Sequence, residues 1–340
     1  MTVAIVILNY NGKAHLTQFL PFVVKYSHPH HIVIADNGST DDSVIFIKQN
    51  YPSIHLIEIE ENLGFTGGYN YALNFLDQDI LVLLNSDVEV TPNWISPILL
   101  MMENDNSIAA CQPKLLSFDQ RSRFEYAGAA GGFIDKLGFP FCRGRVFQIM
   151  ESDTGQYNNS TRIFWASGAC MFIKNELFKS IGGFDEDFFA HMEEIDLCWR
   201  LQNAGFSIYY NGDSKVYHVG GGTLSKANPN KTYYNFRNGL SMLIKNEKQG
   251  RLWWKLPLRI LFDLVAAVKF IFADSWKDGW AVIKAHGYFW TKIGRIIKKR
   301  NLAKIYWKKS RAVFYNKFIV IEYYLKGKKK FSDFDSKSWK

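Results

Sequence analysis

Apolar runs alternate with amphipathic segments over residues 1–210. The runs, rich in Val, Ile and Leu, predict strands at residues 3–8, 31–35, 54–59, 80–84, 163–173 and 206–210. Apolar residues at helical spacing predict helices at residues 15–26, 41–50, 67–77 and 192–204. Because the strands are apolar throughout and alternate with helices, we expect an α/β fold whose mostly parallel central sheet is covered on both faces.

Two further stretches differ from this alternation. Residues 117–162 are rich in glycine and polar residues, which predicts a long loop or a small hairpin region, and loops of this length inside a domain are usually functional. After about residue 232 the pattern is helical and basic, and we expect helices to the end of the chain. The sequence therefore predicts an α/β domain over residues 1–245 and a helical, basic and aromatic appendage over residues 246–340.

Polar side chains stand where the predicted strands end. They are Asn9, Asp36, Asn85, Ser86, Asp87 and, after a later apolar and aromatic run, His218. Parallel sheets bind ligands beyond the carboxyl ends of their strands, so these residues are candidates for one binding site. Taken singly, each also suits a structural role, because Asp and Asn are common in turns and helix caps.

Five ordered blocks of sequence carry a family resemblance. They read VILNYNG at 6–12, ADNGSTDDS at 35–43, NLGFTGGYNYAL at 62–73, LLNSDVEVTPNWI at 83–95, and a long run from SGACMFIK at 167–174 through GGFDEDFFAHMEEIDLCWRLQNAG at 182–205 to VYHVGGGT at 216–223. Over roughly residues 1–245 the chain resembles the inverting glycosyltransferases of family 2, which have the Rossmann-like GT-A fold. The pattern is most similar to rhamnosyltransferase-like and galactofuranosyltransferase-like members.

The resemblance implies a site for a nucleotide-sugar donor. Asp36 would accept the imide N–H of the base, and Asn9 would help to hold the nucleoside. The glycines after the third strand would let the backbone approach the donor closely, although a plain strand-to-helix turn also explains them. The expected donor-binding residues are Asn9, Asp36, Asn37, Gly64, Gly67, Gly68, Asn85, Ser86 and Arg237. Arg143 and Arg145 are further candidates for the diphosphate, or are solvated loop arginines.

A divalent cation is implied at the fourth strand. Asn85-Ser86-Asp87 occupies the place of the family's Asp-x-Asp motif, with Asn at the first position. The resemblance makes Asp87 and His218 the protein ligands of Mn²⁺ or Mg²⁺, and diphosphate and water complete the shell of oxygen ligands. An imidazole ligand favours Mn²⁺ over Mg²⁺.

The general base is implied in the segment EEIDL at residues 193–197. Inverting transfer needs a carboxylate that takes the proton of the acceptor hydroxyl. Family members place Asp at the second position of this segment, so Glu194 is the expected base and Glu193 the alternative. The extra methylene of Glu194 displaces the carboxylate, and the acids also suit the first turn of a helix, where negative charge is favourable.

The acceptor is expected beside this segment. The residues predicted to contact it are Trp165, Ser167, Gly168 and Asp196. Trp165 and the pair Phe188-Phe189 offer flat faces for sugar rings, although aromatic residues at such positions are more often part of the core. Asp196 and Arg200 stand four residues apart, which predicts a supporting ion pair on one helix face.

The charge of the chain is distributed unevenly. Residues 251–340 carry 22 Lys and Arg against 6 Asp and Glu, whereas residues 1–250 carry 19 against 26. Tryptophans and other bulky apolar residues are interleaved with the positive charges, a pattern typical of amphipathic helices that lie on anionic membrane. Packing on the catalytic domain, homo-oligomer formation and nucleic-acid binding are the alternatives, and we expect no nucleic-acid partner because no binding motif accompanies the charge.

The remaining features limit the place of action. Four cysteines lie about 30 residues apart without a CxxC pair, which favours reduced thiols over a zinc site or a disulfide framework. The first residues form an apolar strand pattern without a basic leader or a cleavage site, so we expect no signal peptide. Charges interrupt the apolar stretch at 256–273, so it makes a poor membrane span. We expect a cytoplasmic protein, peripheral on the inner face of a bacterial membrane.

The sequence thus predicts a metal-dependent, inverting glycosyltransferase. It would move a sugar from a nucleotide-diphosphate donor, dTDP-rhamnose or a UDP-sugar, to a lipid-linked or growing surface polysaccharide. A nucleotide-binding scaffold without activity is an alternative, since Asn85 and Glu194 depart from the family pattern. A sugar-nucleotide nucleotidyltransferase is less favoured, because the turn after the first strand offers only Lys13 for a phosphate.

Overall fold

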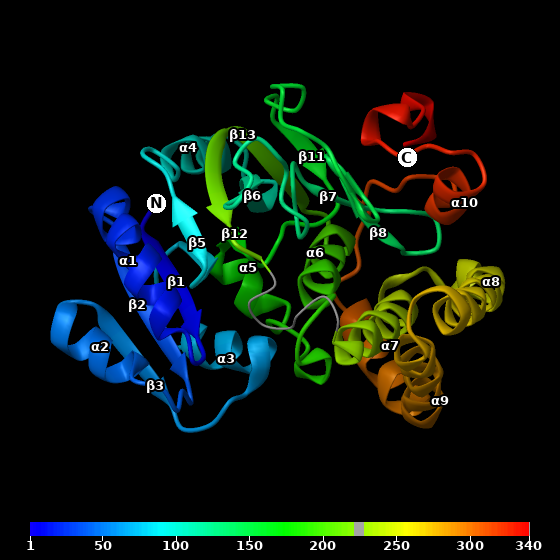
Figure 1. The fold of residues 1–340 in the computed structure, drawn as a ribbon, viewed down its shortest axis with the longest axis horizontal. Helices are drawn as coiled ribbons and strands as arrows, with labels where there is room; N and C mark the ends of the chain where they lie inside the picture. The colour runs from blue at the N-terminus through cyan, green and yellow to red at the C-terminus, as the bar shows by residue number, and fades with distance from the viewer. Residues whose placement is uncertain (221–227, 340) are drawn as a thin grey trace.

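The computed structural model describes residues 1–220 and 228–339 and has an α/β fold. The central sheet within these residues has nine strands in the order β11-β13-β6-β12-β4-β1-β2-β3, with β5 paired to β13 (Figure 1). The strands are β1 Val3–Asn9, β2 His31–Asn37, β3 His55–Ile59, β4 Ile80–Asn85, β5 Val88–Val90, β6 Ile108–Ser117, β11 Thr161–Ile163, β12 Cys170–Lys174 and β13 Ser207–His218. The predicted fold class is confirmed.

Strands β4, β1, β2 and β3 form the parallel half of this sheet. Alternate residues of each strand point to opposite sides of the sheet, so apolar strands make both faces apolar. Helices cover both faces. In β1, Ile5 and Ile7 pack in the same core as α1, and Ala4 and Val6 pack in the core that contains α3. The helices described up to residue 210 are α1 Lys13–Ser27, α2 Ser43–Asn50, α3 Gly64–Leu73, α4 Ser96–Asn104, α5 Asn175–Ser180 and α6 Glu193–Asn203.

The other half of the sheet is mixed. Strand β12 runs antiparallel between β4 and β6, and β13 lies parallel to β6. A second sheet, in the order β10-β9-β8-β7, fills the region predicted to be a loop or hairpins. Its strands are β7 Gly132–Ile134, β8 Pro140–Cys142, β9 Arg145–Val146 and β10 Ile149–Met150. The hairpin prediction for this region is confirmed.

Two strand predictions are wrong in extent. The run predicted as one strand at 163–173 belongs to two, β11 and β12, which pair with different neighbours. The strand predicted at 206–210 continues to His218: its residues 212–214 are skipped in the pairing, and it pairs with β6 again from Lys215. This longer β13 carries His218 to the site described below.

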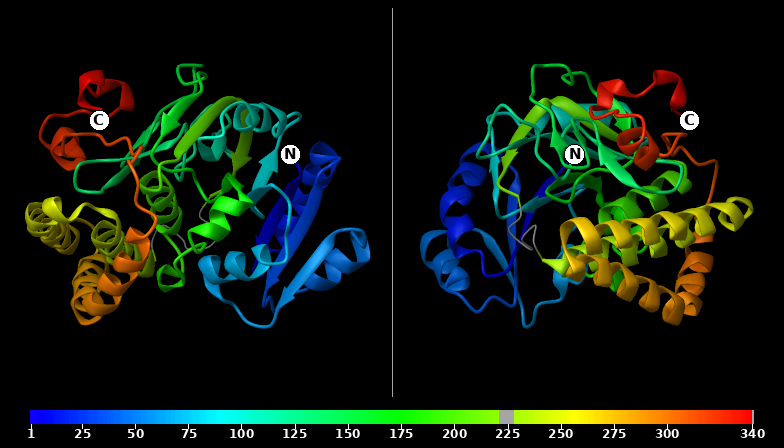
Figure 2. Two further views of the ribbon diagram at one scale, coloured as in Figure 1. Left: turned by 180° about the vertical axis from the view of Figure 1, so that it is seen from behind. Right: turned by 45° about the vertical axis from the view of Figure 1, so that its right-hand side comes forward.

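Three long helices gather on the side of the molecule away from β3 and α2 (Figures 1 and 2). They are α7 Pro229–Asn246, α8 Gln249–Lys269 and α9 Trp276–Lys304, and the π-helical turn η2 Phe270–Asp274 joins the last two. Among the described residues, no helix combines the length and the apolar character needed to cross a membrane.

The expectation of helices to the end of the chain is wrong. After α9 the chain is irregular apart from short turns, α10 Ile319–Tyr324, η3 Phe331–Asp333 and η4 Ser336–Ser338. It returns to the small sheet, where the Tyr315 N–H donates to the Ile134 carbonyl (3.0 Å). The rings of Phe331 and Trp339 pack on Phe133, so aromatic residues of the tail complete the main core instead of forming another helix.

Candidate active site

The carboxyl ends of β1 and β2 bring two predicted residues together. Asn9 and Asp36 are both buried, and the Asn9 side-chain amide donates to the Asp36 carboxylate (2.9 Å). The other oxygen of Asp36 accepts the Ser39 N–H (2.9 Å). Because a carboxylate has about four lone pairs, each oxygen still has one for an N–H of a ligand. The pairing of adjacent strands in register therefore builds a preorganised acceptor at this edge.

Asn37 supports a neighbouring loop. Its amide nitrogen donates to the Gly64 carbonyl (3.0 Å) and to Asn62, and its oxygen accepts the Leu63 N–H (3.1 Å). Gly64 has a φ of +71°, and a Cβ there would lie 2.5 Å from the Phe189 ring. Cβ atoms at the other two predicted glycines would meet Leu63 and Leu8 at 2.8 Å. The close approaches that these glycines permit are thus to protein side chains.

Asp87 and His218 meet although they are 131 positions apart in the sequence. The antiparallel pairing of β13 with β5 sets His218 opposite Val88, the residue next to Asp87. The His218 Nε2 atom lies 3.1 Å from Asp87 Oδ1 and 3.4 Å from the side-chain nitrogen of Asn85. The second oxygen of Asp87 accepts the Gly220 N–H (3.2 Å). The end of the VYHVGGGT block, residues 221–223, lies outside the described residues.

Glu125 completes this cluster, and the sequence analysis did not find it. One of its oxygens lies 3.4 Å from His218 Nδ1, and the other accepts the Ala127 N–H (2.6 Å). All three side chains of the cluster are buried. Burial acts against the charged imidazolium, but the carboxylates of Glu125 and Asp87 outweigh it and raise the pKa of His218 to about 10. Burial also opposes ionisation of Asp87, yet His218 lowers the pKa of that carboxyl.

The cluster fits a divalent cation on its donor set. A metal-binding His commonly has a carboxylate beside its second ring nitrogen, and a Glu125 oxygen lies 3.4 Å from His218 Nδ1. Nε2 faces Asp87, and a cation that binds between them would displace the proton that the pKa of about 10 keeps on the imidazole, so that the two would form an N/O ligand pair. No group of three or more His, Cys, Asp or Glu side chains that could hold a metal occurs in the described parts of the chain. A cation here would take its other ligands from substrate and water, as cations bound to diphosphates do.

The EEIDL segment starts helix α6. Glu193 is buried and Glu194 partly buried, and each has one carboxyl oxygen that is buried without a hydrogen-bond partner within the described residues. Burial raises the pKa of Glu194 to about 7. Burial and then the Glu194 carboxylate raise the pKa of Glu193 well above its ordinary value. A carboxyl with a pKa near 7 and a free lone pair suits a general base at neutral pH.

The loop before α6 is strained. Three of its residues, Phe189, His191 and Met192, have φ values of +61°, +68° and +71°. Such backbone persists only where surrounding contacts fix it, and it concentrates at functional sites. We call residues 186–192 the Phe189 loop. Its Phe189 carbonyl accepts the Phe65 N–H of α3 (2.9 Å), so the loop is bound to the glycine segment.

Arg237 and Asn238 of α7 hold the Phe189 loop from the other side. Arg237 donates to the carbonyls of Asp187 (2.7 Å) and Phe188 (2.9 Å). Asn238 donates to the carbonyls of Phe188, Ala190 and His191 (3.1, 3.0 and 2.7 Å). The predicted donor-binding residue Arg237 therefore positions the loop that leads to the two glutamates.

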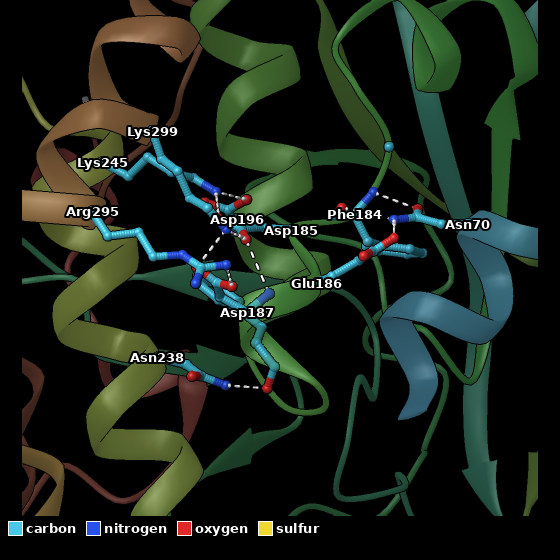
Figure 3. Close-up of polar contacts among 12 residues, drawn as sticks. Asn70, Phe184, Asp185, Glu186, Asp187, Asp196, Asn238, Lys245, Arg295 and Lys299 are labelled. Carbon is cyan, nitrogen blue, oxygen red and sulfur yellow. Dashed lines mark hydrogen bonds and ion pairs between the residues drawn. The ribbon is translucent and has the colours of Figure 1, made fainter. Parts of the chain in front are cut away.

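An ion-pair network surrounds the same loop (Figure 3). Lys245 lies 2.7 Å from Asp185 and 2.8 Å from Asp196, and Lys299 of α9 pairs with Asp185 and Asp187. On the α3 side, Asn70 donates to Glu186 and to the Phe184 carbonyl, both at 3.0 Å. The loop is thus held between α3, α7 and α9.

Two electrostatic effects reach from the surroundings of the His218 cluster to the segment around Glu194. Burial raises the pKa of the Cys142 thiol, Arg145 opposes that rise, and the carboxylates of Glu125 and Glu194 add to it, so both carboxylates lie near this one side chain. The Lys231 ammonium stands 5.5 Å from the Tyr126 ring centre, beside Glu125, and adds to burial in lowering the pKa of His191 to about 4. The carboxylates of Glu125 and Glu194 therefore both act on Cys142, and Lys231 acts on His191, two residues before Glu193.

Comparison with known proteins identifies the family. The model for Glycosyl transferase family 2 matches residues 4–182, more than half of the chain. The chain belongs to glycosyl transferase family 2. It is 26% identical over 279 residues to the N-acetylglucosaminyl-diphospho-decaprenol L-rhamnosyltransferase of Mycobacterium tuberculosis, covering 75% of this chain and 87% of the relative. It is 23% identical over 217 residues to Rhamnosyltransferase WbbL of Escherichia coli, covering 61% and 80%.

The fold of this glycosyltransferase has solved counterparts. A crystal structure of GalNAc-T7 with UDP, GalNAc and Mn²⁺ matches with a TM-score of 0.56 at 17% identity, covering 72% of this chain and 48% of that one. The likeness is one of fold. The predicted family, its rhamnosyltransferase-like members and the transferase class are confirmed.

The predicted acceptor residues of the glycosyltransferase lie in the core. Trp165 is buried under the Gly132 backbone, and its indole N–H donates to the Phe133 carbonyl (3.1 Å). Ser167 donates to the Ala127 carbonyl, and Gly168 packs on a phenylalanine ring. All three residues are thus buried in contacts with the protein itself.

Three other charged residues of the site prediction are structural. Asp196 is fully buried. It forms the predicted ion pair with Arg200 (2.8 Å). Arg143 bonds Asn159, and Arg145 donates to the Tyr126 carbonyl (2.9 Å). Neither arginine is a loop residue free to close over a diphosphate, because both are buried.

Proposed function

We propose that this glycosyltransferase moves a sugar with inversion and with a divalent cation, from a nucleotide-diphosphate donor to a lipid-linked or growing surface glycan. The observation that carries the proposal is the meeting of Asp87, His218 and Glu125, and a buried carboxyl with a pKa of about 7, that of Glu194, supports it. The donor would be dTDP-rhamnose or a UDP-sugar. The names of two relatives support rhamnose, and UDP and Mn²⁺ accompany the structural counterpart.

The chemistry assigns a role to each group. Glu194 takes the proton of the acceptor hydroxyl while that oxygen attacks the anomeric carbon, and the bond from this carbon to the diphosphate oxygen breaks. The electron pair leaves with the nucleoside diphosphate. A cation held by Asp87 and His218 would offset the negative charge on that leaving group. Asp36 accepts an N–H of the base through its remaining lone pairs.

Helix α8 supports the membrane part of the proposal. Its buried face carries Lys255, Arg259 and Asp263, whereas its outer face is apolar. The exposed apolar residues of α8 and η2 are Trp253 (76% exposed), Leu261, Leu264, Val265, Val268, Ile271 and Phe272 (84%). An outer apolar face on a segment rich in Lys, Arg and Trp suits an anionic membrane surface. In this proposal residues 1–245 transfer the sugar, and residues 246–340 hold the protein at the lipid that carries the acceptor.

Substitutions in the cluster of Asp87, His218 and Glu125 test the function. We expect Asp87→Asn to lower sugar transfer on the order of 10²-fold or more, because it removes a charged ligand. Glu125→Gln should raise the Mn²⁺ concentration needed for half-maximal rate by about 10- to 100-fold, and added Mn²⁺ should restore its rate. Steady-state transfer from dTDP-rhamnose and UDP-sugars, with a chelator and with added Mn²⁺, measures both effects.

Asp77→Asn is the matched control, because the Asp77 side chain is fully exposed. It should leave the rate unchanged. Transfer that persists in the presence of a chelator and in Asp87→Asn would contradict the metal-assisted reaction.

A further inference from the structure

A hollow of about 340 Å³ opens between the first turns of α7 and α9. Its lining combines aromatic rings with ammonium groups, which are residue types that hold phosphorylated headgroups at membranes. The residues that matter for the argument are Asn230, Tyr233, Trp276, Lys277, Trp280 and Lys284. None of the residues in this lining belongs to the site described above.

The two lysines of the hollow are available to an anion. Within residues 1–220 and 228–339, neither Lys277 nor Lys284 makes an ion pair or a side-chain hydrogen bond. The nearest acid in sequence, Asp278, accepts a hydrogen bond from Thr232. Two free ammonium groups beside an amide and a phenol can therefore bind phosphate oxygens by charge-assisted hydrogen bonds.

The hollow borders the apolar outer face. Trp276 and Trp280 are 64% and 53% exposed, and the apolar stripe of α8 ends at Phe272, four residues before Trp276. Tryptophans prefer the boundary between lipid chains and water, and their rings tolerate contact with both. A lipid chain lying along the stripe would place a polar headgroup at the hollow.

One helix separates the hollow from the active site. Tyr233 lines the hollow, while the next residue, Tyr234, stacks on Phe189 of the Phe189 loop with ring centres 5.9 Å apart. Lys231, one turn earlier, reaches Tyr126 beside Glu125. A helix with its side chains is about 10–12 Å across, so a group in the hollow lies about that far from the site where the sugar is transferred.

We propose that this hollow binds the phosphate or diphosphate headgroup of the lipid that carries the acceptor, with Lys277 and Lys284 as its cationic ligands. The lipid chain follows the stripe from Phe272 along α8, and the saccharide passes the first turns of α7 to reach Glu194. The inference deepens the proposed function and rests on its lipid-linked acceptor. It assigns the recognition of lipid phosphate to residues outside the sugar-transfer site.

Vesicle binding by the full-length protein tests the assignment. The probes are phosphatidylcholine vesicles with and without a long-chain isoprenyl diphosphate, and binding is measured by flotation. We expect wild type to prefer the doped vesicles, and the double variant Lys277→Gln/Lys284→Gln to lose about tenfold or more of its affinity for them. Thermal unfolding of both proteins checks that the variant is folded.

The control removes the same charge from the same helix. Lys298→Gln/Lys304→Gln changes two exposed lysines of α9 that lie outside the hollow. It should keep the preference for doped vesicles. Equal losses in both double variants would show an effect of bulk charge and overturn the proposal. Release of the protein from doped vesicles by an equal concentration of inorganic diphosphate would overturn it as well, because the hollow would then be a site for soluble diphosphate.

A failure of the headgroup site can be distinguished from a failure of the proposed function. Donor hydrolysis without acceptor requires the active site but not the hollow, so both double variants should hydrolyse dTDP-rhamnose or a UDP-sugar at the wild-type rate. A failed vesicle test with intact hydrolysis overturns the headgroup site alone. Loss of hydrolysis in wild type with every donor contradicts the proposed function instead.

Discussion

Carboxyl oxygens of the two glutamates that start α6 and the ion pair Arg259–Asp263 of α8 are all buried, but their surroundings differ. In α6, Glu193 and Glu194 have buried oxygens without hydrogen-bond partners within the described residues, and burial raises the pKa values of both. In α8, Arg259 pairs with Asp263 (2.9 Å), and Asp263 also lies 3.3 Å from His286. The carboxyls of Glu193 and Glu194 are therefore poised to exchange protons, whereas the charges of Asp263 and Arg259 neutralise one another.

The difference separates chemistry from scaffold. A buried carboxyl without a partner is unfavourable to folding, and it persists where function needs it. A buried pair costs less while both partners are present, and it lets α8 turn its polar face inward and its apolar face outward. The pairing state of each acid, and not its burial, predicts what a substitution does.

The largest effect is expected at Glu194. Glu194→Gln should lower transfer on the order of 10²- to 10⁴-fold, because it removes the general base and keeps the shape. Glu194→Asp restores the residue common in the family but withdraws the carboxylate, so we expect an intermediate loss. Steady-state rates of transfer measure both. Wild-type activity retained in Glu194→Gln would move the base to Glu193.

The pH dependence sharpens the same comparison. The base must be ionised, so the rate of wild type should rise with pH through about 7 and level off above it. The folded state holds the proton more tightly than the unfolded state, so Glu194 contributes a loss of stability as the pH rises from its ordinary pKa to about 7. Glu194→Gln lacks that loss. Its thermal midpoint should equal that of wild type in acid and exceed it above pH 7.

The next effect concerns the paired charges of α8. Asp263→Ala leaves the Arg259 guanidinium buried against the Phe139 ring and should lower the free energy of unfolding by about 3–5 kcal/mol. Chemical denaturation measures the change. Replacing both partners, as Arg259→Met/Asp263→Leu, should recover most of it, because no unpaired charge remains. Asp77→Ala, at an exposed position, should stay within about 0.5 kcal/mol of wild type. A mild effect in Asp263→Ala would show that the pair is not essential.

The smallest effect on stability is expected on the outer face of α8. Leu264→Ser and Val268→Ser should each change the free energy of unfolding by less than about 0.5 kcal/mol, because both side chains are already exposed. Together they should weaken binding to anionic vesicles. Leu20→Ser in α1, which empties a buried position of the same type, is the contrast and should cost about 2–5 kcal/mol. Unchanged vesicle binding in the α8 variants would place the membrane contact elsewhere.

Sequence reasoning named two residues that the fold brings together, and it did not find the residues that support them. Asp87 and His218 were predicted together from a family pattern, and β5–β13 pairing brings them to 3.1 Å. Glu125 was missed because it lies in an irregular segment with no periodic or motif signal, and only the tertiary fold sets it beside His218. Arg237 was predicted to bind the donor, but its guanidinium holds backbone carbonyls of the Phe189 loop, an arrangement that no local pattern encodes.

The sequence alone determined the α/β class and the parallel half of the sheet, because both follow from the short-range periodicity of the apolar runs and their order along the chain. It also determined where the acids of the EEIDL segment lie, at the start of a helix. Only the tertiary structure decided which side of each helix is covered. Helix α8 has an amphipathic pattern that fits either orientation, and its charged face is inward because Leu137, Phe139 and His286 supply partners there. Likewise, the aromatic residues after 310 fold onto the small sheet because that sheet leaves Phe133 and Phe141 to be covered. Burial is a property of what packs against a segment, and the segment alone does not contain it.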